Sequence, residues 1–571
     1  MRRLTALLAL VAAIPLLCRA QEAEPIFERT YLSTDKDVYV AGDRIWCSAF
    51  CFDAAGKGLS RSSAIAYAEL VSVGGEVIRT AKIGLEGGRG SGYIDLPEGM
   101  PTGNYRLFAY TAVNRNEADY DFLLNSKVIS VLNALNSSKV RNKVSLVSDA
   151  LYRQRKEAVS PDRECGELDV RVTGTPEQGG IFRVELENAG SSPVSLSVSV
   201  YREDSIAAPE DKSICSVRIP EGNRAKYSGL YSPETEGEII RATLSGRDRE
   251  RIISDEAGAT AFISASSAKG DTYTSLIGRD GSIVFKTNNI YGQRELVTEV
   301  ADLEDRNLQA MVDISTPFVR VDADVPVLDL CAAIADDVLE RGRGMQSFRM
   351  EYRDSLAEFT GRKEEFPYRE SGALTYDLDD YTRFPTVREV LVEITPEVRV
   401  RGRNGKQRIQ VLTKDNDLEG AITTSWETSL VLLDGVPVFR HSDMMDYDAM
   451  LIKEIQIWRE RFVFGNRIFS GIVNFKSVKG NMAFMDFGSN VRIIDFQGIC
   501  YPMDYTRRHT PEGGVDRRGT IFWKPDLELS AGQGVSLECL APDHGGFFRI
   551  EVEGVTAEGE PVHKVTKFAI D

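Results

Sequence analysis

Four short strand-like runs lie within Leu430–Lys479, and this segment constrains the fold more than any other part of the 571-residue chain. The first two runs flank Asp434-Gly435, a dipeptide that favours the tight turn of a β-hairpin. The third run, Ile455–Trp458, alternates apolar and polar residues as a half-buried strand does, and the fourth is Gly471–Phe475. The spacing predicts a compact unit built mainly of short strands.

The rest of the chain also favours β-structure. Glycine is plentiful, with 48 residues, and long helical periodicity is scarce. Val327–Arg341 has the clearest helical spacing. At about 100–200 residues for each domain, a chain of this length holds about three to five domains.

The first twenty residues have the pattern of a secretory signal. Arg2 and Arg3 precede the apolar stretch Leu4–Leu17, and a small residue, Ala20, stands where cleavage is expected. A lipid anchor at Cys18 is a less favoured alternative, because lipoprotein processing prefers a small residue where Leu17 stands, and an uncleaved anchor is another. No later run reaches the ~18 apolar residues of a membrane-spanning helix.

The charge of the chain argues against nucleic acid as a partner. Without residues 1–20, the chain has 66 basic and 86 acidic residues, a net charge of −20. Such a protein repels a polyanion on balance. Solubility explains the charge more simply than a cation-binding role does.

Seven cysteines follow the signal, so at least one thiol is unpaired within a monomer. Cys47 and Cys51 are about 13 Å apart in one predicted strand, which is too far for a disulfide. Cys165 and Cys215 flank one predicted sandwich and could pair. Buried free thiols are the favoured interpretation.

The segment 383–480 resembles the plug domain of TonB-dependent outer-membrane receptors, in which an "hDGhPh" hairpin precedes an "IExIEV…YG…GVIxI" segment. Within it, Val387–Ile394 has helical spacing, Pro396 ends that helix, and Arg403–Lys406 is a turn signal. Only 92 residues follow Lys479, too few for a barrel of about 22 strands. The resemblance implies a plug-like α+β domain without its barrel. Because Val387–Ile394 fits a helix better than a TonB box, direct TonB coupling is not expected.

Residues 25–132 contain two motifs of regularly spaced residues. The first motif is Y-x-x-x-D-K-x-x-Y-x-x-G-D, at Tyr31, Asp35, Lys36, Tyr39, Gly42 and Asp43. The second is L-P-x-x-x-P-x-G-x-Y-x-L-x-A-Y-T, at Leu96, Pro97, Pro101, Gly103, Tyr105, Leu107, Ala109, Tyr110 and Thr111. Through these motifs, residues 25–132 are similar to the second macroglobulin-type domain of α2-macroglobulin-like proteins. The resemblance implies a β-sandwich in which these residues are structural.

The remaining predicted segments complete a series of modules. They are a polar linker at 133–160, a β-sandwich at 165–222, a β-sandwich resembling a carboxypeptidase-regulatory-like repeat at 237–320, a helix and irregular connector at 327–382, and an extended connector at 491–518. The last module, 519–571, resembles the end of macroglobulin-like sandwiches at Trp523, Pro525, Phe548, Ile550, Val552 and Gly554. The predicted fold class is mainly β: tandem immunoglobulin-like or macroglobulin-like sandwiches with a plug-like domain near the C-terminus.

Residues with the spacing of a chemical site are scarce. The four histidines, His441, His509, His544 and His563, are far apart and share no zinc-ligand spacing. Two groups of acidic residues do not match the spacing of a calcium-binding loop, so we expect both to lie in solvated loops. The first group is Asp377, Asp379 and Asp380, and the second is Asp443, Asp446 and Asp448. Cys165-Gly166-Glu167 is followed by Leu168, whereas the macroglobulin thioester motif CGEQ has Gln. We predict no catalytic, cofactor-binding or metal-ligating residue.

The order of modules resembles uncharacterised Gram-negative envelope proteins with macroglobulin-type and plug-like domains. It implies a non-enzymatic exported protein that acts in protein–protein recognition or assembly at the periplasm or outer membrane. Its expected partner is a protein of that compartment, and a role accessory to an outer-membrane transporter is one form of this function. The alternatives are a macroglobulin-like protease-binding defence protein and a hydrolase with an unrecognised site.

Overall fold

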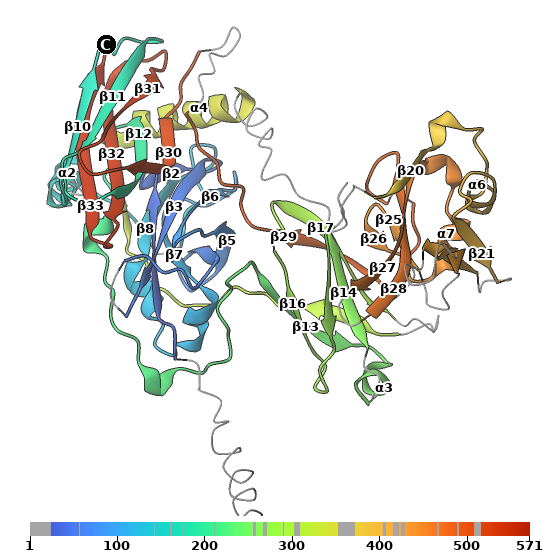
Figure 1. The fold of residues 1–571 in the computed structure, drawn as a ribbon. Coiled ribbons are helices and arrows are strands. Elements are labelled where there is room, and N and C mark those ends of the chain that lie inside the picture. The colour runs from blue at the N-terminus through green and yellow to red at the C-terminus, as the bar shows by residue number, and fades with distance from the viewer. Residues whose placement is uncertain are drawn as a thin grey trace, which may run out of the picture.

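A computed structural model gives the fold, and the prediction of a mainly β protein is confirmed (Figure 1). The structure describes residues 24–571 except 56–57, 142, 160–162, 175, 211, 255–258, 266–270, 289, 302–308, 352–371, 403–406, 415–421, 424–428, 465–466, 483, 488–489 and 507–514. The signal predicted at 1–20, the alternative anchor at Cys18, the turn at Arg403–Lys406 and His509 lie outside the described residues.

The first sandwich holds eight strands in two sheets. One sheet has the order β1-β3-β6 and the other β2-β8-β7-β4-β5. The strands are β1 (Glu28–Thr34), β2 (Val38–Val40), β3 (Arg44–Asp53), β4 (Ile65–Val71), β5 (Val77–Gly84), β6 (Arg89–Asp95), β7 (Gly103–Tyr110) and β8 (Lys127–Leu132). Alternate side chains such as Ile45, Ala49 and Leu107 meet in the core between the sheets.

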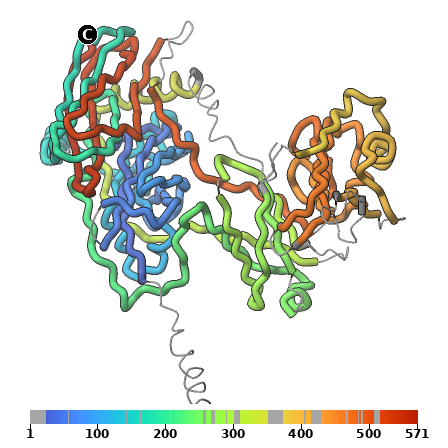
Figure 2. The backbone as a smooth tube through the Cα atoms, in the orientation of Figure 1, coloured from blue at the N-terminus to red at the C-terminus, as the bar shows by residue number. Residues whose placement is uncertain are grey.

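The second sandwich combines two distant parts of the chain, and this corrects the prediction of separate sandwiches at 165–222 and 519–571. Its sheets have the orders β10-β11-β31 and β30-β12-β32-β33. The strands are β10 (Leu168–Thr173), β11 (Ile181–Asn188), β12 (Val194–Arg202), β30 (Thr520–Leu529), β31 (Gly534–Leu540), β32 (Gly546–Thr556) and β33 (Pro561–Ile570). Neither part covers its apolar faces alone, because one core contains side chains of both. Figure 2 shows the red C-terminal strands beside the earlier teal ones.

The third unit is also completed by a late strand. Its sheets are β16-β13-β18 and β15-β14-β17-β29. The strands are β13 (Ile239–Ser245), β14 (Thr260–Ala265), β15 (Asp271–Leu276), β16 (Ser282–Lys286), β17 (Gln293–Ala301), β18 (Met311–Ile314) and β29 (Arg492–Gln497), and α3 spans Arg249–Ser254. The predicted connector at 491–518 therefore contains β29, which pairs antiparallel with β17 and adds Phe496 to the core.

The fourth unit is α+β and contains Leu430–Lys479. Its main sheet has the order β20-β27-β28-β25-β26. The elements are β20 (Leu374–Asp377), α6 (Val387–Glu393), β21 (Val398–Arg401), β22 (Arg408–Val411), β23 (Thr413–Lys414), β24 (Ile422–Thr423), β25 (Leu430–Leu433), β26 (Val436–Pro437), α7 (His441–Asp446), β27 (Ile452–Phe464) and β28 (Arg467–Ser477). The helix predicted at Val387–Ile394 is present as α6, and Thr386 caps it in a capping box with Glu389.

The helix predicted at Val327–Arg341 begins later than expected. Residues Leu328–Leu330 form β19, which pairs in parallel with β9 (Val144–Leu146), and α4 runs from Ala335 to Glu351. Leu328 packs against Val144 and other apolar side chains, so tertiary contact fixes the extended form. The predicted linker 133–160 holds β9 and α2 (Asp149–Ala158). Among the described residues, no helix combines the length and apolar character needed to cross a bilayer.

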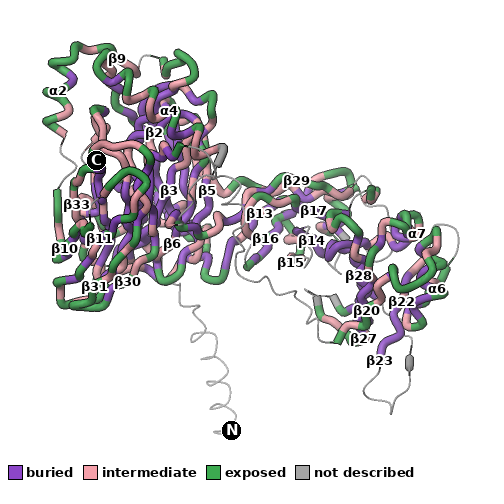
Figure 3. The backbone as a smooth tube through the Cα atoms, turned by 90° about the horizontal axis from the view of Figure 1, so that it is seen from above, coloured by how far each residue is buried: buried purple, intermediate pink, exposed green. Residues whose placement is uncertain are grey.

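The two sandwiches pack face to face, which produces four stacked sheets. The β1-β3-β6 sheet turns Leu32 and Cys47 toward its own core and Tyr31 and Phe50 toward the second sandwich, where Val555 lies. All seven residues of β1 are therefore buried. Figure 3 shows buried backbone running through this double sandwich.

Candidate functional site at the junction of the two sandwiches

The first macroglobulin-type motif forms a hydrogen-bond network at this junction. Asp35 is fully buried, and its carboxylate accepts hydrogen bonds from the Tyr39 hydroxyl at 2.7 Å and the Trp46 backbone N–H at 3.1 Å. It also accepts one from Thr520 Oγ1 at 2.6 Å, which belongs to the second sandwich. Lys36 lies 3.3 Å from Asp43. These motif residues therefore join the sandwiches, and burial raises the pKa of Asp35 against the opposing effect of Lys36.

A buried carboxylate–histidine cluster lies on the β32–β33 hairpin. Glu551 and Glu553 are two residues apart on β32, so both point to the same face, and His563 on β33 is the cross-strand partner of Glu553. Ligand atoms of the three side chains lie within 4.8 Å of one another. We did not predict this site, because the histidines are isolated in the sequence. The signal that could have found it is the E-x-E spacing followed by a hairpin turn and a histidine.

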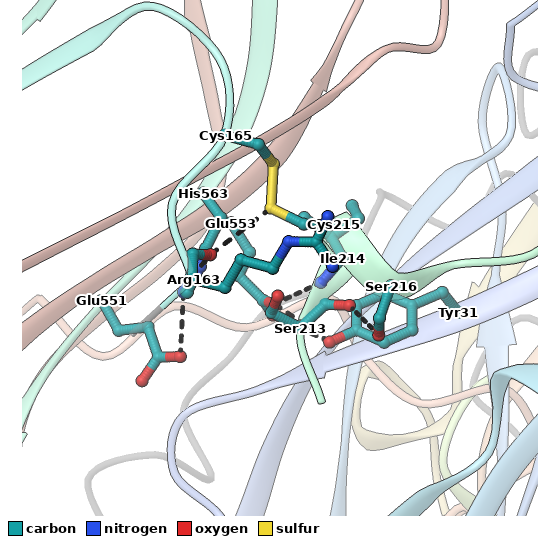
Figure 4. Close-up of a disulfide and its surroundings, with 10 residues drawn as sticks. All are labelled: Tyr31, Arg163, Cys165, Ser213, Ile214, Cys215, Ser216, Glu551, Glu553 and His563. Carbon is teal, nitrogen blue, oxygen red and sulfur yellow. Dashed lines mark hydrogen bonds and ion pairs between the residues drawn. A yellow bond between two sulfur atoms is a disulfide. The ribbon is translucent and has the colours of Figure 1, made fainter. Parts of the chain in front are cut away.

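The cluster, near the C-terminus, bonds to segments from the N-terminal half of the chain (Figure 4). The Tyr31 hydroxyl of β1 donates to Glu553 Oε1 at 3.0 Å, and the Ile214 backbone N–H donates to the same atom at 2.8 Å. Glu551 Oε2 accepts from the Tyr201 hydroxyl at 2.8 Å and from Arg549 Nε at 3.1 Å. The carboxylates are thus engaged with neighbouring donors.

His563 is surrounded by acceptors, which favours its doubly protonated form. Its Nδ1 lies 2.7 Å from the Arg163 carbonyl oxygen, and its Nε2 lies 3.2 Å from Glu551 Oε1. Since both partners accept hydrogen bonds, both ring nitrogens act as donors. Burial lowers the pKa of His563, but the hydrogen bond with Glu551 and the charge of Glu553 outweigh it and raise the pKa to about 9. Arg549 and His563 hold the pKa of Glu551 well below its ordinary value, despite burial.

The cluster could offer three ligand atoms to a metal ion, but its hydrogen bonds favour a structural network. Binding an ion at His563 would require loss of the Nε2 proton, which Glu551 stabilises. Positive charges also lie close by, since Arg549 pairs with Glu551 and Lys127 lies 2.8 Å from Asp37. The arrangement can hold the two sandwiches together through mutually compensated charges.

We expect the stability of the protein to fall between about pH 6.5 and pH 9 because of His563. Its folded pKa of about 9 lies above the ordinary value of 6.5, so folding binds a proton in this range. The contribution, about 3 kcal/mol by the size of the shift, is complete below pH 6.5 and is lost as the pH rises through 9. Denaturant unfolding at several pH values measures it. His563→Gln should flatten the profile, whereas His544→Gln should not; an unchanged profile in His563→Gln contradicts the assignment.

Cys165 and Cys215 form a disulfide beside this cluster, which corrects the interpretation of both as free thiols. Their Cα atoms are 6.3 Å apart. Cys165 exchanges two backbone hydrogen bonds with His563, and Cys215 belongs to η3 (Ile214–Ser216). The bond therefore fixes Ile214, which is fully buried against Tyr31, Phe50 and Val555. Cys47, Cys51, Cys331, Cys500 and Cys539 are free.

The Asp434-Gly435 turn of the α+β unit also carries a buried carboxylate. Asp434 and Gly435 have φ angles of +50° and +80°, as the predicted hairpin turn requires. The Asp434 carboxylate accepts hydrogen bonds from Ser477 N–H and Oγ at 2.7 and 2.6 Å and from Met482 N–H at 2.7 Å. Asp434 therefore ties the hairpin to the end of β28, which the turn pattern alone did not predict.

His441 should make the α+β unit sensitive to acid. Burial, with a smaller effect of Arg408, lowers the pKa of His441 to about 3, and its Nδ1 accepts a hydrogen bond from the Ile409 N–H. Since the ordinary value is 6.5, its stabilising effect is complete above that pH and is lost as the pH falls toward 3. Hydrogen exchange of β22 and β25 should report up to about 5 kcal/mol of local destabilisation at pH 3. His441→Gln should reduce this acid dependence, and equal dependence in both proteins contradicts it.

Four residues of the acidic groups considered for calcium serve local structure. Asp377 caps η6 (Leu378–Asp380), and Asp379 pairs with Arg383 at 2.5 Å. Asp448 caps η7 (Ala449–Leu451), and Asp443 pairs with Arg440 at 2.7 Å. The Cys165 sulfur is used by the disulfide and is not available for a thioester.

Comparisons with known proteins identify no family. No family model matches the chain, and no curated protein is similar to it in sequence. Structural similarity extends to Escherichia coli alpha-2-macroglobulin in its native conformation (TM-score 0.23, 9% identity, 96% of this chain and 40% of that one). It also extends to Salmonella alpha-2-macroglobulin reacted with methylamine (TM-score 0.21, 11% identity, with the same coverage of 96% and 40%). A tandem-repeat region of a large adhesion protein matches at TM-score 0.12 and 9% identity, over 96% of this chain and 99% of that one.

This chain thus spans less than half the length of the macroglobulins that it matches. TM-scores this low carry no argument about fold or function, so the macroglobulin-like and plug-like assignments stay predictions.

Proposed function

We propose that this protein is a non-enzymatic, exported protein of the Gram-negative cell envelope that acts in protein–protein recognition or assembly. The signal-like residues 1–20 support export. The charge network at the sandwich junction supports a structural rather than a catalytic role, because Glu551, Glu553 and His563 are engaged with one another and with neighbouring donors and acceptors.

An exposed apolar pair on the β27–β28 hairpin carries the proposal. Val463 and Ile468 are directly opposed across the two strands, so their side chains lie on the same face. Their exposed fractions are 75% and 53%. Isolated exposed apolar residues are common, but two β-branched side chains placed together near the end of a hairpin provide an apolar surface that a partner protein can cover.

Photo-crosslinking in intact envelopes tests the proposal. A photoreactive residue at position 463 should capture a periplasmic or outer-membrane protein. A photoreactive residue placed away from position 463 should capture less of the same partner protein when Val463→Ser and Ile468→Ser are combined. Leu230→Ser, at a 70% exposed leucine outside this unit, is the matched control. Recovery of no envelope protein, or equal capture by both variants, counts against the proposal.

Two further assays separate the alternative functions. Incubation with a panel of proteases, followed by gel filtration, should yield no trapped complex if the protein is not a macroglobulin-like inhibitor. A screen of ester, amide, phosphoester and glycoside substrates should yield no turnover. A stable protease complex would support the protease-binding alternative instead of the proposed function. A hydrolysed substrate would support the hydrolase alternative.

A further inference from the structure

A cavity of about 430 Å³ lies beside the charge network, at a place where several parts of the chain meet. Its walls come from the residues before β2, from α2, from the end of β12 with the segment after it, and from α4, β32 and β33. Seven of the lining residues are Lys or Arg and four are Asp or Glu. This positive balance is opposite to that of the whole chain, which has 69 basic and 86 acidic residues.

Two arginines are fixed in the inner wall of the cavity. Arg549 is only 3% exposed, and its Nε is bound to Glu551. Arg341 donates to both carboxylate oxygens of Asp204, at 2.5 and 3.1 Å, and to the Val38 carbonyl oxygen at 2.6 Å. Contacts of this kind hold the guanidinium groups in place before a ligand arrives, which reduces the entropy lost on binding.

Most acidic side chains in the wall are already compensated. Asp37 lies 2.8 Å from Lys127, a lysine outside the lining, and Asp204 is bound by Arg341. Glu203 lies 2.9 Å from Lys567.

Lys36 is also compensated, since it lies 3.3 Å from Asp43, and three other cations are left to supply the positive excess. Arg202 is 3.9 Å from its nearest paired carboxylate, on Asp337. Lys156 donates to the backbone oxygen of Asp204 at 2.8 Å, a neutral acceptor. Arg153 is exposed on the same helix, α2, and lines the cavity. The cavity thus combines two arginines held by carboxylates with three cations that lack a close carboxylate partner among the contacts described.

We propose that this cavity binds a small organic anion through its phosphate, sulfate or carboxylate groups. Its volume lies within the range of about 300–1,000 Å³ that is common for small-molecule sites. Arginine and lysine recognise these oxyanions through charge-assisted hydrogen bonds, and the planar guanidinium can bind two oxygens at once. Because both sandwiches contribute to the wall, a bound anion should also strengthen their association.

Isothermal titration of the intact protein tests the site with three probes: inorganic phosphate, pyrophosphate and citrate. Saturable binding to one site is expected, with pyrophosphate or citrate binding more tightly than phosphate, since each carries more negative charge. Preference between those two distinguishes a phosphate ligand from a carboxylate ligand. Added NaCl should weaken binding through screening. Absence of saturable binding at about 10 mM of every probe overturns the proposal.

Two variants on α2 make the test specific. Combining Arg153→Gln with Lys156→Gln should weaken binding about tenfold or more, as expected for the loss of charged hydrogen-bonding groups. Arg155→Gln is the matched control, because Arg155 lies on the same helix, is exposed, and pairs with Asp329 outside the cavity. Binding that is unchanged in the double variant, or equally weakened in the control, shows that the anion does not bind here and overturns the proposal.

Discussion

Deletion of residues 519–571 should unfold Leu168–Arg202, even though more than 300 residues separate the two segments. β12 lies between β30 and β32, and β11 pairs with β31, so the deletion removes pairing partners and half of the shared core. The amides of β10–β12 should lose protection equal to the stability of the sandwich, about 5–15 kcal/mol for an ordinary domain. Hydrogen exchange with mass spectrometry measures this directly.

The third unit provides the internal control for this deletion. β13 pairs with β16 and β18, and β17 pairs with β14 and β29; because all of these strands precede residue 519, their amides should stay protected. Protection that persists in β10–β12 would show that 165–222 is an independent sandwich after all.

Replacing both Cys165 and Cys215 by serine should destabilise the double sandwich by about 4 kcal/mol. The disulfide closes a loop with a sequence separation of 50, and chain-entropy theory relates that length to this free energy. The loss also releases Ile214, whose N–H binds Glu553 and whose side chain is buried between the sandwiches. Denaturant unfolding monitored at the tryptophans Trp46 and Trp523 should report it.

Cys331→Ser is the control for the disulfide experiment. Cys331 is a free, partly buried thiol, so its replacement should change the free energy of unfolding by less than about 1 kcal/mol. A similarly small change in the double variant would show that the bond does not stabilise the junction.

The sequence predicted local features better than the pairing of distant strands. Val387–Ile394 has helical spacing and a capping pair, and Asp434-Gly435 has the residues of a tight turn, so both features are specified by neighbours in the sequence. The apolar spacing of Val327–Arg341 also suits a helix, but Leu328–Leu330 form a strand because they pair with β9. A run of three residues is too short for periodicity to decide.

The E-x-E spacing and the following histidine are only a local signal for the candidate site, because its assembly depends on strand register and on long-range packing. His563 meets Glu553 only through the pairing of β32 with β33, and Tyr31 reaches the cluster only when the sandwiches are stacked. Cys165 and Cys215 flank one predicted sandwich, but the distance between them depends on where the second half of the chain places η3. The sequence predicts sandwiches at 165–222 and 519–571 without indicating that their strands share one core.

The shared core has a consequence for the time course of synthesis. About 320 residues separate the end of β12 from the start of β30, and at roughly 5–20 residues per second a ribosome needs about 15–60 s to make them. During this interval β10–β12 lack their later neighbours and expose apolar faces, while the α+β unit between them can already fold. The nascent chain therefore has a period of vulnerability to aggregation that ends only when β30–β33 arrive.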